Sequence, residues 1–172
     1  ENEGCSRFIG APVHLTAMMQ DPSFKDRDLS ALKCLVVGGS NPPVELIKQF
    51  SLEFQADVIN GYGMTETCGL SCTALPTDPP ELKAIAGLPL PGVSLRVVDE
   101  NYELVKHDLP GELLYKGPGL MEGYGNLPDG SSGINDDGWF PTGDLATMNS
   151  NGYINIVDRS KEMIISGGEN LY

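Results

Sequence analysis

The spacing of apolar residues predicts alternating helix and strand in the first part of the chain. Residues 12–20 carry apolar side chains at helical spacing, and the Asp21-Pro22 pair after them is typical of a helix end. Residues 34–37 form a continuous apolar run that Gly38-Gly39 stops, as in a strand buried within a parallel sheet. We therefore expect a helix followed by a buried strand.

A second helix and a second strand follow. Asn41 is expected to cap a helix whose first turn holds Pro42 and Pro43. Residues 57–60 then form a short strand. This order predicts a right-handed parallel crossover, with both glycine-rich segments at the carboxyl ends of the strands, where open α/β sheets bind ligands. The apolar residues on one face of the helix are Leu46, Ile47, Phe50 and Phe54.

From about residue 84 onward, the apolar residues fall in short runs separated by Gly and Pro, which is a β pattern. Asn151 and Gly152 are expected to supply the positive φ angles of a hairpin turn over residues 149–152. The predicted fold class is α/β plus β, in which an antiparallel barrel or sandwich packs against the end of the α/β layer. The proline-rich residues 76–80 would join the two parts. The runs are residues 93–98, 112–115, 145–148, 153–157 and 163–165.

Composition narrows the classes of partner. The chain has 172 residues with 24 acidic and 11 basic side chains, and its formal net charge of −13 argues against a nucleic-acid backbone or an anionic membrane as partner. No apolar stretch is long enough to predict a transmembrane segment. The four cysteines lack metal-ligand spacing, which indicates reduced thiols and a cytoplasmic protein.

The most distinctive segment is Asn60-Gly61-Tyr62-Gly63-Met64-Thr65-Glu66-Thr67. Its glycines permit torsions and close approaches that a Cβ would block, so Tyr62 can present its ring while Thr65 and Glu66 face a polar group. A ring for a base, a hydroxyl for a phosphate and a carboxylate for a hard cation together suit a nucleotide with magnesium. The alternative is a strand-to-helix turn in which Thr65 and Glu66 cap the next helix.

Other segments follow in a characteristic order: Gly111-Glu112-Leu113, Gly123-Tyr124, residues 137–144 (Asp-Gly-Trp-Phe-Pro-Thr-Gly-Asp), Gly152-Tyr153-Ile154, Asp158-Arg159-Ser160-Lys161 and residues 166–170 (Ser-Gly-Gly-Glu-Asn). With residues 60–67, this order and spacing resemble the adenylate-forming superfamily of acyl-CoA synthetases, peptide-synthetase adenylation domains and beetle luciferases. The resemblance spans nearly the whole chain. It implies a reaction of a carboxylic acid with ATP, giving an acyl adenylate and pyrophosphate, and then transfer of the acyl group to a thiol.

The resemblance also implies how the chain is divided. Residues 1–80 would be the carboxyl-terminal part of an α/β nucleotide-binding subdomain, residues 81–160 a β-barrel-like subdomain, and residues 161–172 the hinge and the start of a C-terminal domain. Compared with the family, the chain begins after the Ser/Thr/Gly-rich phosphate loop and stops before the C-terminal lysine. We therefore expect a fragment that is inactive by itself.

The resemblance further assigns nucleotide-binding roles. Tyr62 would stack on adenine within the segment Asn60 to Met64, and Ser40, Asn41 and Pro42 would line the other face. Thr65 would bind a phosphate and Glu66 would bind Mg²⁺, so both count as catalytic. The alternative for Tyr62 is a tyrosine buried in the core.

Asp144 is the candidate for the ribose, since a fixed carboxylate can accept hydrogen bonds from both vicinal hydroxyls. Arg159 is its counterpart on the next hairpin strand, and Ile156 on that strand would also border the nucleotide. The hairpin brings Asp144 and Arg159 to the same end of the sheet. The alternative is a surface salt bridge that contributes little.

Three further residues take roles from the resemblance alone. Lys161 matches the hinge about which the C-terminal domain swings, and Gly167 with Gly168 would form the loop that the thiol arm of CoA passes. The alternatives are a solvated lysine and an ordinary β-turn.

We expect the longer protein, of which this chain would be a fragment, to be an acyl-CoA synthetase. It would act on a fatty or other small-molecule carboxylic acid with ATP, Mg²⁺ and CoA. An amino-acid adenylation domain is the alternative enzyme. A nucleotide-binding paralogue without catalytic activity is the alternative from a different class.

Overall fold

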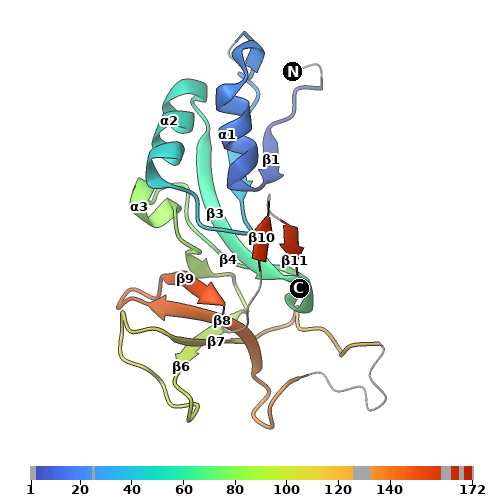
Figure 1. The fold of residues 1–172 in the computed structure, drawn as a ribbon, viewed down its shortest axis with the longest axis vertical. Helices are drawn as coiled ribbons and strands as arrows, with labels where there is room; N and C mark the ends of the chain where they lie inside the picture. Colours follow the sequence, from blue (N-terminus) through green and yellow to red (C-terminus); the bar gives the residue numbers. More distant parts are fainter. Residues whose placement is uncertain (1–2, 25, 126–132, 160–163, 167–168, 172) are drawn as a thin grey trace.

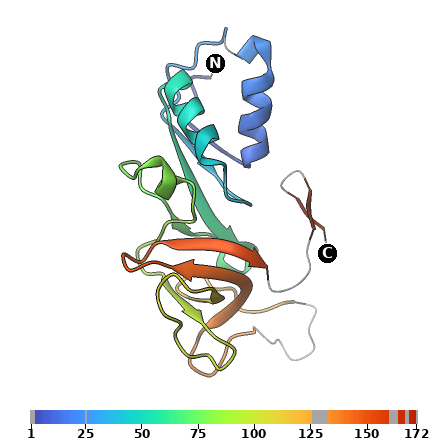
Figure 2. The same cartoon turned by 60° about the vertical axis from the view of Figure 1, so that its left-hand side comes forward.

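The computed structural model describes residues 3–24, 26–125, 133–159, 164–166 and 169–171, with side chains described as far as Asp158. The described residues form two main sheets and a separate two-stranded hairpin. The main sheets are a mixed sheet carrying helices and, below it in Figure 1, an antiparallel sheet. The predicted fold class of α/β plus β is confirmed, and the same two-part arrangement is visible from a second direction in Figure 2. In the described part of the chain, no helix is both long and apolar enough to cross a membrane.

The mixed sheet has five strands in sequence order. The first three are parallel neighbours and the last two join antiparallel. Its strands are β1 (Arg7–Gly10), β2 (Cys34–Val37), β3 (Asp57–Met64), β4 (Gly69–Thr73) and β5 (Leu88–Pro89). The helices of this half are α1 (Pro12–Gln20), the 3-10 helix η1 (Pro22–Phe24), α2 (Val44–Phe54), the 3-10 helix η2 (Thr65–Thr67) and α3 (Pro80–Lys83).

The core of this half is formed by α1, α2 and the parallel strands. Leu15 of α1 and Ile47 and Phe50 of α2 are almost completely buried in one cluster with Leu35 and Val58 of the strands. Leu46 and Phe54 pack partly buried against the same cluster, as the helical spacing predicted. Burial of such side chains contributes about 1.5–3 kcal/mol each, so this face fixes α2 on the sheet.

The second sheet is antiparallel, and its strands pair in sequence order. They are β6 (Ser94–Val98), β7 (Gly111–Lys116), β8 (Phe140–Met148) and β9 (Ile154–Arg159). A separate hairpin of β10 (Ile164–Ser166) and β11 (Glu169–Leu171) follows. Strand β8 begins at Phe140, five positions before the expected start at 145, because Phe140 and Pro141 pair with Tyr115 and Leu114 of β7.

The two sheets share a hydrophobic core. Cys72 of β4 is fully buried in one cluster with Leu113 and Ala146 of the second sheet. Gly87 and Ile154 also exchange two backbone hydrogen bonds, of 3.1 and 2.8 Å. Residues that lie between the sheets are therefore held from both sides.

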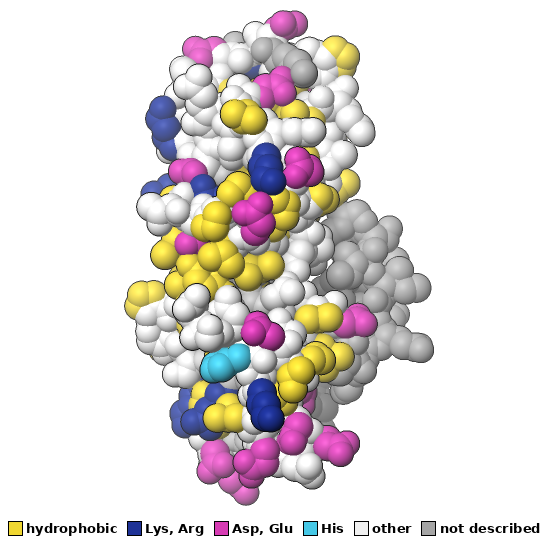
Figure 3. All heavy atoms as spheres, turned by 90° about the vertical axis from the view of Figure 1, so that its left-hand side faces the viewer, with side chains coloured by type: hydrophobic (Ala, Val, Ile, Leu, Met, Phe, Trp, Pro, Cys, Tyr) yellow, Lys and Arg dark blue, Asp and Glu magenta, His cyan; other side chains and the backbone are white. Residues whose placement is uncertain are grey.

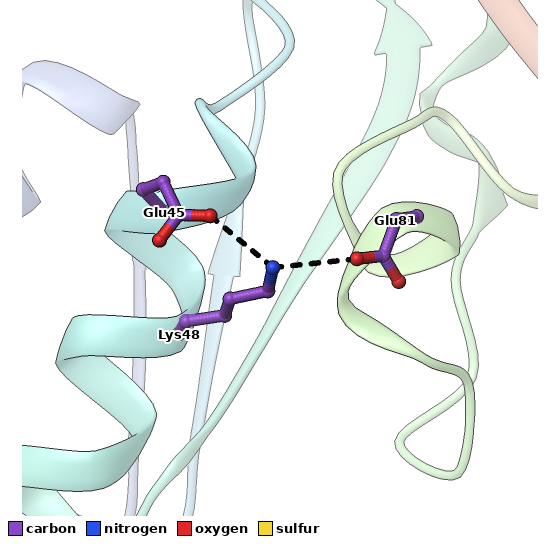
Figure 4. A network of polar contacts seen from close by, with 3 residues as sticks. All are labelled: Glu45, Lys48 and Glu81. Atoms are coloured by element: carbon purple, nitrogen blue, oxygen red, sulfur yellow. Dashed lines mark hydrogen bonds and ion pairs between the residues drawn. The ribbon is translucent and has the colours of Figure 1, made fainter.

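Ion pairs attach the short helix α3 to the mixed sheet. Lys83 Nζ lies 2.8 Å from Asp57 Oδ1 at the start of β3, with only 12% of the lysine side chain exposed. On the surface, Lys48 Nζ of α2 lies 3.2 Å from Glu45 and 3.4 Å from Glu81 (Figure 4). The face in Figure 3 has apolar side chains across its middle and acidic ones at its lower end.

Three local predictions were wrong. The strand predicted for residues 57–60 does not end at residue 60, because β3 continues through Met64 and pairs with β4. Asn41 does not cap α2, which starts at Val44 with Pro43 as its cap residue and no side-chain cap bond. In the hairpin turn only Gly152 has a positive φ, of 83°, and Asn151 does not. There, Asn149 Oδ1 accepts hydrogen bonds from the backbone N–H groups of Asn151 and Tyr153.

Candidate functional site

Tyr62 and Asp144 meet at the junction of the two sheets. The Tyr62 hydroxyl on β3 donates a hydrogen bond to Asp144 Oδ2 on β8. Asp144 is 1% exposed. Burial and then the neighbouring Asp144 carboxylate raise the pKa of Tyr62 well above its usual value. The phenol therefore stays protonated and acts as a donor.

Asp144 is fixed by its own strand as well. Its backbone N–H donates to Thr142 Oγ1 at 3.2 Å, and the Thr142 hydroxyl donates to the Leu113 carbonyl of β7 at 2.8 Å. Gly143 between them has a φ of 75°, a conformation that favours glycine. The Thr-Gly-Asp sequence thus turns Asp144 into the space between the sheets.

Asp144 and Arg159 are paired partners in the register of β8 and β9. This confirms the expectation that the hairpin brings the two residues to the same end of the sheet. The structure gives the backbone position of Arg159, while its side chain lies outside the description.

Three asparagines link the two sheets through their side chains. Asn60 Nδ2 donates to Asn41 Oδ1 at 2.9 Å and to the Ala84 carbonyl at 3.2 Å. Asn41 Nδ2 in turn donates to Asn155 Oδ1 at 2.9 Å and to the Ile156 carbonyl at 3.0 Å. Asn41, Asn60 and Ile156, which the sequence analysis selected from segments far apart, therefore lie together.

One atom of this network is unsatisfied. Asn60 is 2% exposed, and among the described residues no group donates a hydrogen bond to its Oδ1. Since a buried acceptor without a donor costs about 1–3 kcal/mol, this oxygen suits a ligand N–H group. Nearby along the chain, Pro42 is buried and Ser40 is exposed.

Thr65 and Glu66 lie in the 3-10 helix after β3. They do not cap a helix, because the cap residue is Met64, whose N–H donates to Thr67 Oγ1 at 3.3 Å. The Thr67 hydroxyl also lies 2.8 Å from the donating Ser71 hydroxyl, which ties the turn to β4. The Thr65 side chain is exposed and Glu66 is half-buried. A hydroxyl and a carboxylate are thus presented on a braced turn.

Residues 121–124 contact this turn through hydrogen bonds to Glu66. The Met121 N–H donates to the Glu66 carbonyl at 2.8 Å, and the Tyr124 hydroxyl donates to Glu66 Oε1 at 2.9 Å. Sequence reasoning missed the roles of Tyr124, Thr142 and Asn155. Tyr124 and Thr142 lie within motifs that carried the resemblance, whereas no local pattern marks Asn155 as a partner of Asn41.

Gly61 and Gly63 are needed for space. Both have ordinary extended backbone, and neither has a positive φ. A Cβ on Gly63 would lie 1.8 Å from the Gly69 carbonyl oxygen of β4, and one on Gly61 would lie 2.5 Å from Leu70 Cδ1. The glycines therefore let β4 approach the strand that carries Tyr62.

The described part of the chain contains no cluster of three His, Cys, Asp or Glu side chains that could hold a metal. A cavity of about 480 Å³ exists elsewhere, and none of its residues is a predicted site residue. Its lining is Arg27, Leu29, Ser30, Leu32, Lys33, Glu53, Phe54 and Gln55. Lys161, Gly167 and Gly168 lie outside the described residues.

Comparison with known proteins is consistent with this geometry. Residues 1–125 match the AMP-binding enzyme family. The chain belongs to this family. It is 36% identical over 172 residues to the indoleacetate–CoA ligase of Aromatoleum aromaticum, covering 100% of this chain and 34% of that protein. It is also 36% identical over 169 residues to the human mitochondrial medium-chain acyl-CoA ligase ACSF2, covering 96% and 28%.

Solved structures of family members also match nearly the whole chain. The fatty acyl CoA synthetase of Mycobacterium tuberculosis matches with a TM-score of 0.83 at 33% identity, over 99% of this chain and 34% of that one. The anthranilate CoA ligase AuaEII in complex with anthranoyl-AMP matches with a TM-score of 0.81 at 26% identity, over 96% and 32%. The chain thus spans about a third of the length of its relatives.

Proposed function

We propose that the protein carrying this chain is an AMP-forming acid–thiol ligase. It would activate a carboxylic acid with ATP, releasing pyrophosphate, and transfer the acyl group from the adenylate to CoA. The observation that carries the proposal is the hydrogen bond between Tyr62 and Asp144 across the two sheets, with the unsatisfied Asn60 Oδ1 two positions before Tyr62 on β3. Two relatives that match the whole chain are named as a CoA ligase and a CoA synthase, which supports the same reaction.

The groups at this junction suit the nucleoside part of ATP. The Tyr62 ring would stack on the adenine, with Ser40, Asn41 and Pro42 on the other face. The unsatisfied Asn60 Oδ1 would accept a hydrogen bond from the adenine amino group. Asp144 would accept hydrogen bonds from the ribose hydroxyls. Strand β9 carries both Arg159, the register partner of Asp144, and Ile156, whose carbonyl accepts from Asn41. The proposed adenine and ribose subsites would therefore adjoin.

The turn at Thr65 and Glu66 suits the phosphates. The Thr65 hydroxyl would donate to a phosphate oxygen, and the Glu66 carboxylate would bind Mg²⁺. A single carboxylate fits this cation, because Mg²⁺ in nucleotide sites takes one or two carboxylates and completes its shell with phosphate oxygens and water. The bound cation supplies charge neutralisation at the phosphates, which a chain of net charge −13 needs.

Catalysis by these residues is a matter of positioning. The nucleoside groups would hold the α-phosphate within reach of the acid, so that a bimolecular encounter becomes an attack within one complex. Tyr124 and Met121 hold Glu66 by hydrogen bonds to its side chain and backbone, so little reorganisation is needed as charge shifts. Gly167 and Gly168 would admit the thiol arm of CoA, and Lys161 would act as the hinge between the two half-reactions.

The substrate is proposed at the level of a fatty or other carboxylic acid in fatty acid metabolism. The relatives are named for indoleacetate, feruloyl, medium-chain and long-chain acyl groups. These acyl groups all come from carboxylic acids but differ in the rest of the molecule, so the names do not define one chain length or structure. We propose a cytoplasmic location.

Acid-dependent exchange of pyrophosphate into ATP tests the proposal. The longer protein that carries this sequence should exchange pyrophosphate with fatty and aromatic acids, whereas the 172-residue chain should not. Exchange only with amino acids would show an amino-acid adenylation domain instead. AMP binding without exchange for any acid would show a paralogue that only binds nucleotide.

A further inference from the structure

The hydroxyl of Tyr62 has a use that stacking of its ring does not explain. It reaches from β3 to Asp144 on β8, two positions 82 residues apart in the chain. The two ends of the Tyr62 side chain would therefore have different roles. The ring would stack on the base near Asn60 of the same strand, and the hydroxyl donates to the Asp144 carboxylate.

Both partners are held in place by their surroundings. Tyr62 is paired with Cys72 in the β3–β4 register and packs against the core shared by the two sheets. Asp144 is 1% exposed, and its backbone is tied to Thr142. A donor fixed by two strands can set the rotation of a buried carboxylate, since a hydrogen bond to a charged group is about twice as strong as a neutral one.

We infer that Tyr62 is a positioning residue whose hydroxyl orients Asp144 toward the ribose, and so sets the preference for ribonucleotides over deoxynucleotides. This inference rests on the proposed function. An ionised carboxylate accepts about four hydrogen bonds, so the bond from Tyr62 is compatible with bonds from two ribose hydroxyls. One side chain would thereby couple the subsite of the base to that of the sugar.

The test is Tyr62→Phe in the longer protein, which keeps the ring and removes the hydroxyl. Isothermal titration with AMP, 2′-deoxy-AMP and 3′-deoxy-AMP avoids any need for magnesium or turnover. The affinity for AMP should fall about tenfold, while the affinities for the deoxynucleotides fall less, so the selectivity decreases. The matched control is Tyr153→Phe, which removes a hydroxyl that donates to Asp78 Oδ1 at 2.7 Å and should leave all three affinities unchanged.

Two results would overturn the inference: an equal loss for all three nucleotides, which marks a hydroxyl that only supports the fold, or tighter AMP binding by the variant, which marks competition with the ribose. A wild-type protein that does not distinguish AMP from the deoxynucleotides would instead contradict the proposed role of Asp144.

If Tyr62→Phe does not fold, 3-fluorotyrosine at position 62 keeps the hydroxyl and reports on its partner. Its fluorine resonance should shift more with AMP than with 2′,3′-dideoxy-AMP, because only AMP engages Asp144. Identical shifts would also overturn the inference.

Discussion

The side-chain amide of Asn41 donates to Asn155 Oδ1 at 2.9 Å, joining residues 114 positions apart. Asn41 follows the first glycine-rich segment and Asn155 lies on β9 of the second sheet. Their contact spans the junction where Tyr62 and Asp144 also meet. The relative position of the two sheets at the candidate site is thus set in part by one pair of amides.

Asn155→Leu should weaken this junction. The variant leaves Asn41 Nδ2 with the Ile156 carbonyl as its remaining described acceptor, so the free energy of unfolding should fall by about 1 kcal/mol. Urea denaturation of the 172-residue chain measures the change. Asn101→Leu, in an exposed turn, is the control and should stay within about 0.5 kcal/mol of wild type. Equal effects of the two variants would show that the Asn41–Asn155 contact contributes nothing.

Glu66→Gln should slow adenylation in the longer protein by roughly 100-fold, because it removes the charge that would bind Mg²⁺ while keeping an acceptor for the Tyr124 hydroxyl. Pyrophosphate exchange at limiting magnesium measures the rate, and equilibrium binding of the acid should be unchanged. Glu122→Gln, at an exposed glutamate two positions before Tyr124, is the matched control. Unchanged exchange by Glu66→Gln would refute its role at the metal.

Gly63→Ala should destabilise the chain by about 3 kcal/mol, since the new Cβ would lie 1.8 Å from the Gly69 carbonyl oxygen and force β3 and β4 apart. Gly125→Ala provides the comparison, because a Cβ there meets nothing within 4 Å. The difference between their free energies of unfolding checks the packing at β4. A Gly63→Ala variant as stable as Gly125→Ala would contradict it.

Stability should fall at alkaline pH because of Cys72. Burial raises the pKa of this thiol from 9.0 to about 12, so between these pH values the unfolded chain loses a proton that the folded chain keeps. The contribution is complete below pH 9 and is lost with rising pH at up to about 1.4 kcal/mol per unit. Cys72→Ala should reduce this slope in denaturation measured from pH 8 to 10, while Cys68→Ala, at an exposed position, should not.

Lys161→Pro in the longer protein should impair thioester formation more than adenylation. Proline fixes φ at the residue proposed to change torsion, and adenylation needs only one of the two domain orientations. Pyrophosphate exchange measures the first half-reaction, and transfer from preformed acyl adenylate to CoA measures the second. A uniform decrease, or no change in either, would indicate a surface lysine.

Much of the fold could be read from local spacing. Strand β2 matches residues 34–37 as predicted, and α1 matches residues 12–20, because an apolar run with its flanking breakers records how each segment is buried. The adjacency of Asp144 and Arg159 also followed, since a short hairpin determines its own register.

The sequence by itself therefore determined the order of elements, the family and most of the residues gathered at the junction. Only the tertiary structure decided which of those residues touch. Asn41 looked like a helix cap but bonds to β9, because Pro43 precedes the helix with a φ of −57° and a ψ of 136° and leaves the Asn41 amide to a partner in the other sheet. The second strand was predicted to end at residue 60 but continues to Met64, because the glycines at 61 and 63 let β4 approach closely enough to pair with it. The local spacing of apolar residues cannot predict that Asn41 contacts β9 or that residues 61–64 pair with β4. Such long-range contacts form because the two sheets bury side chains in a shared core.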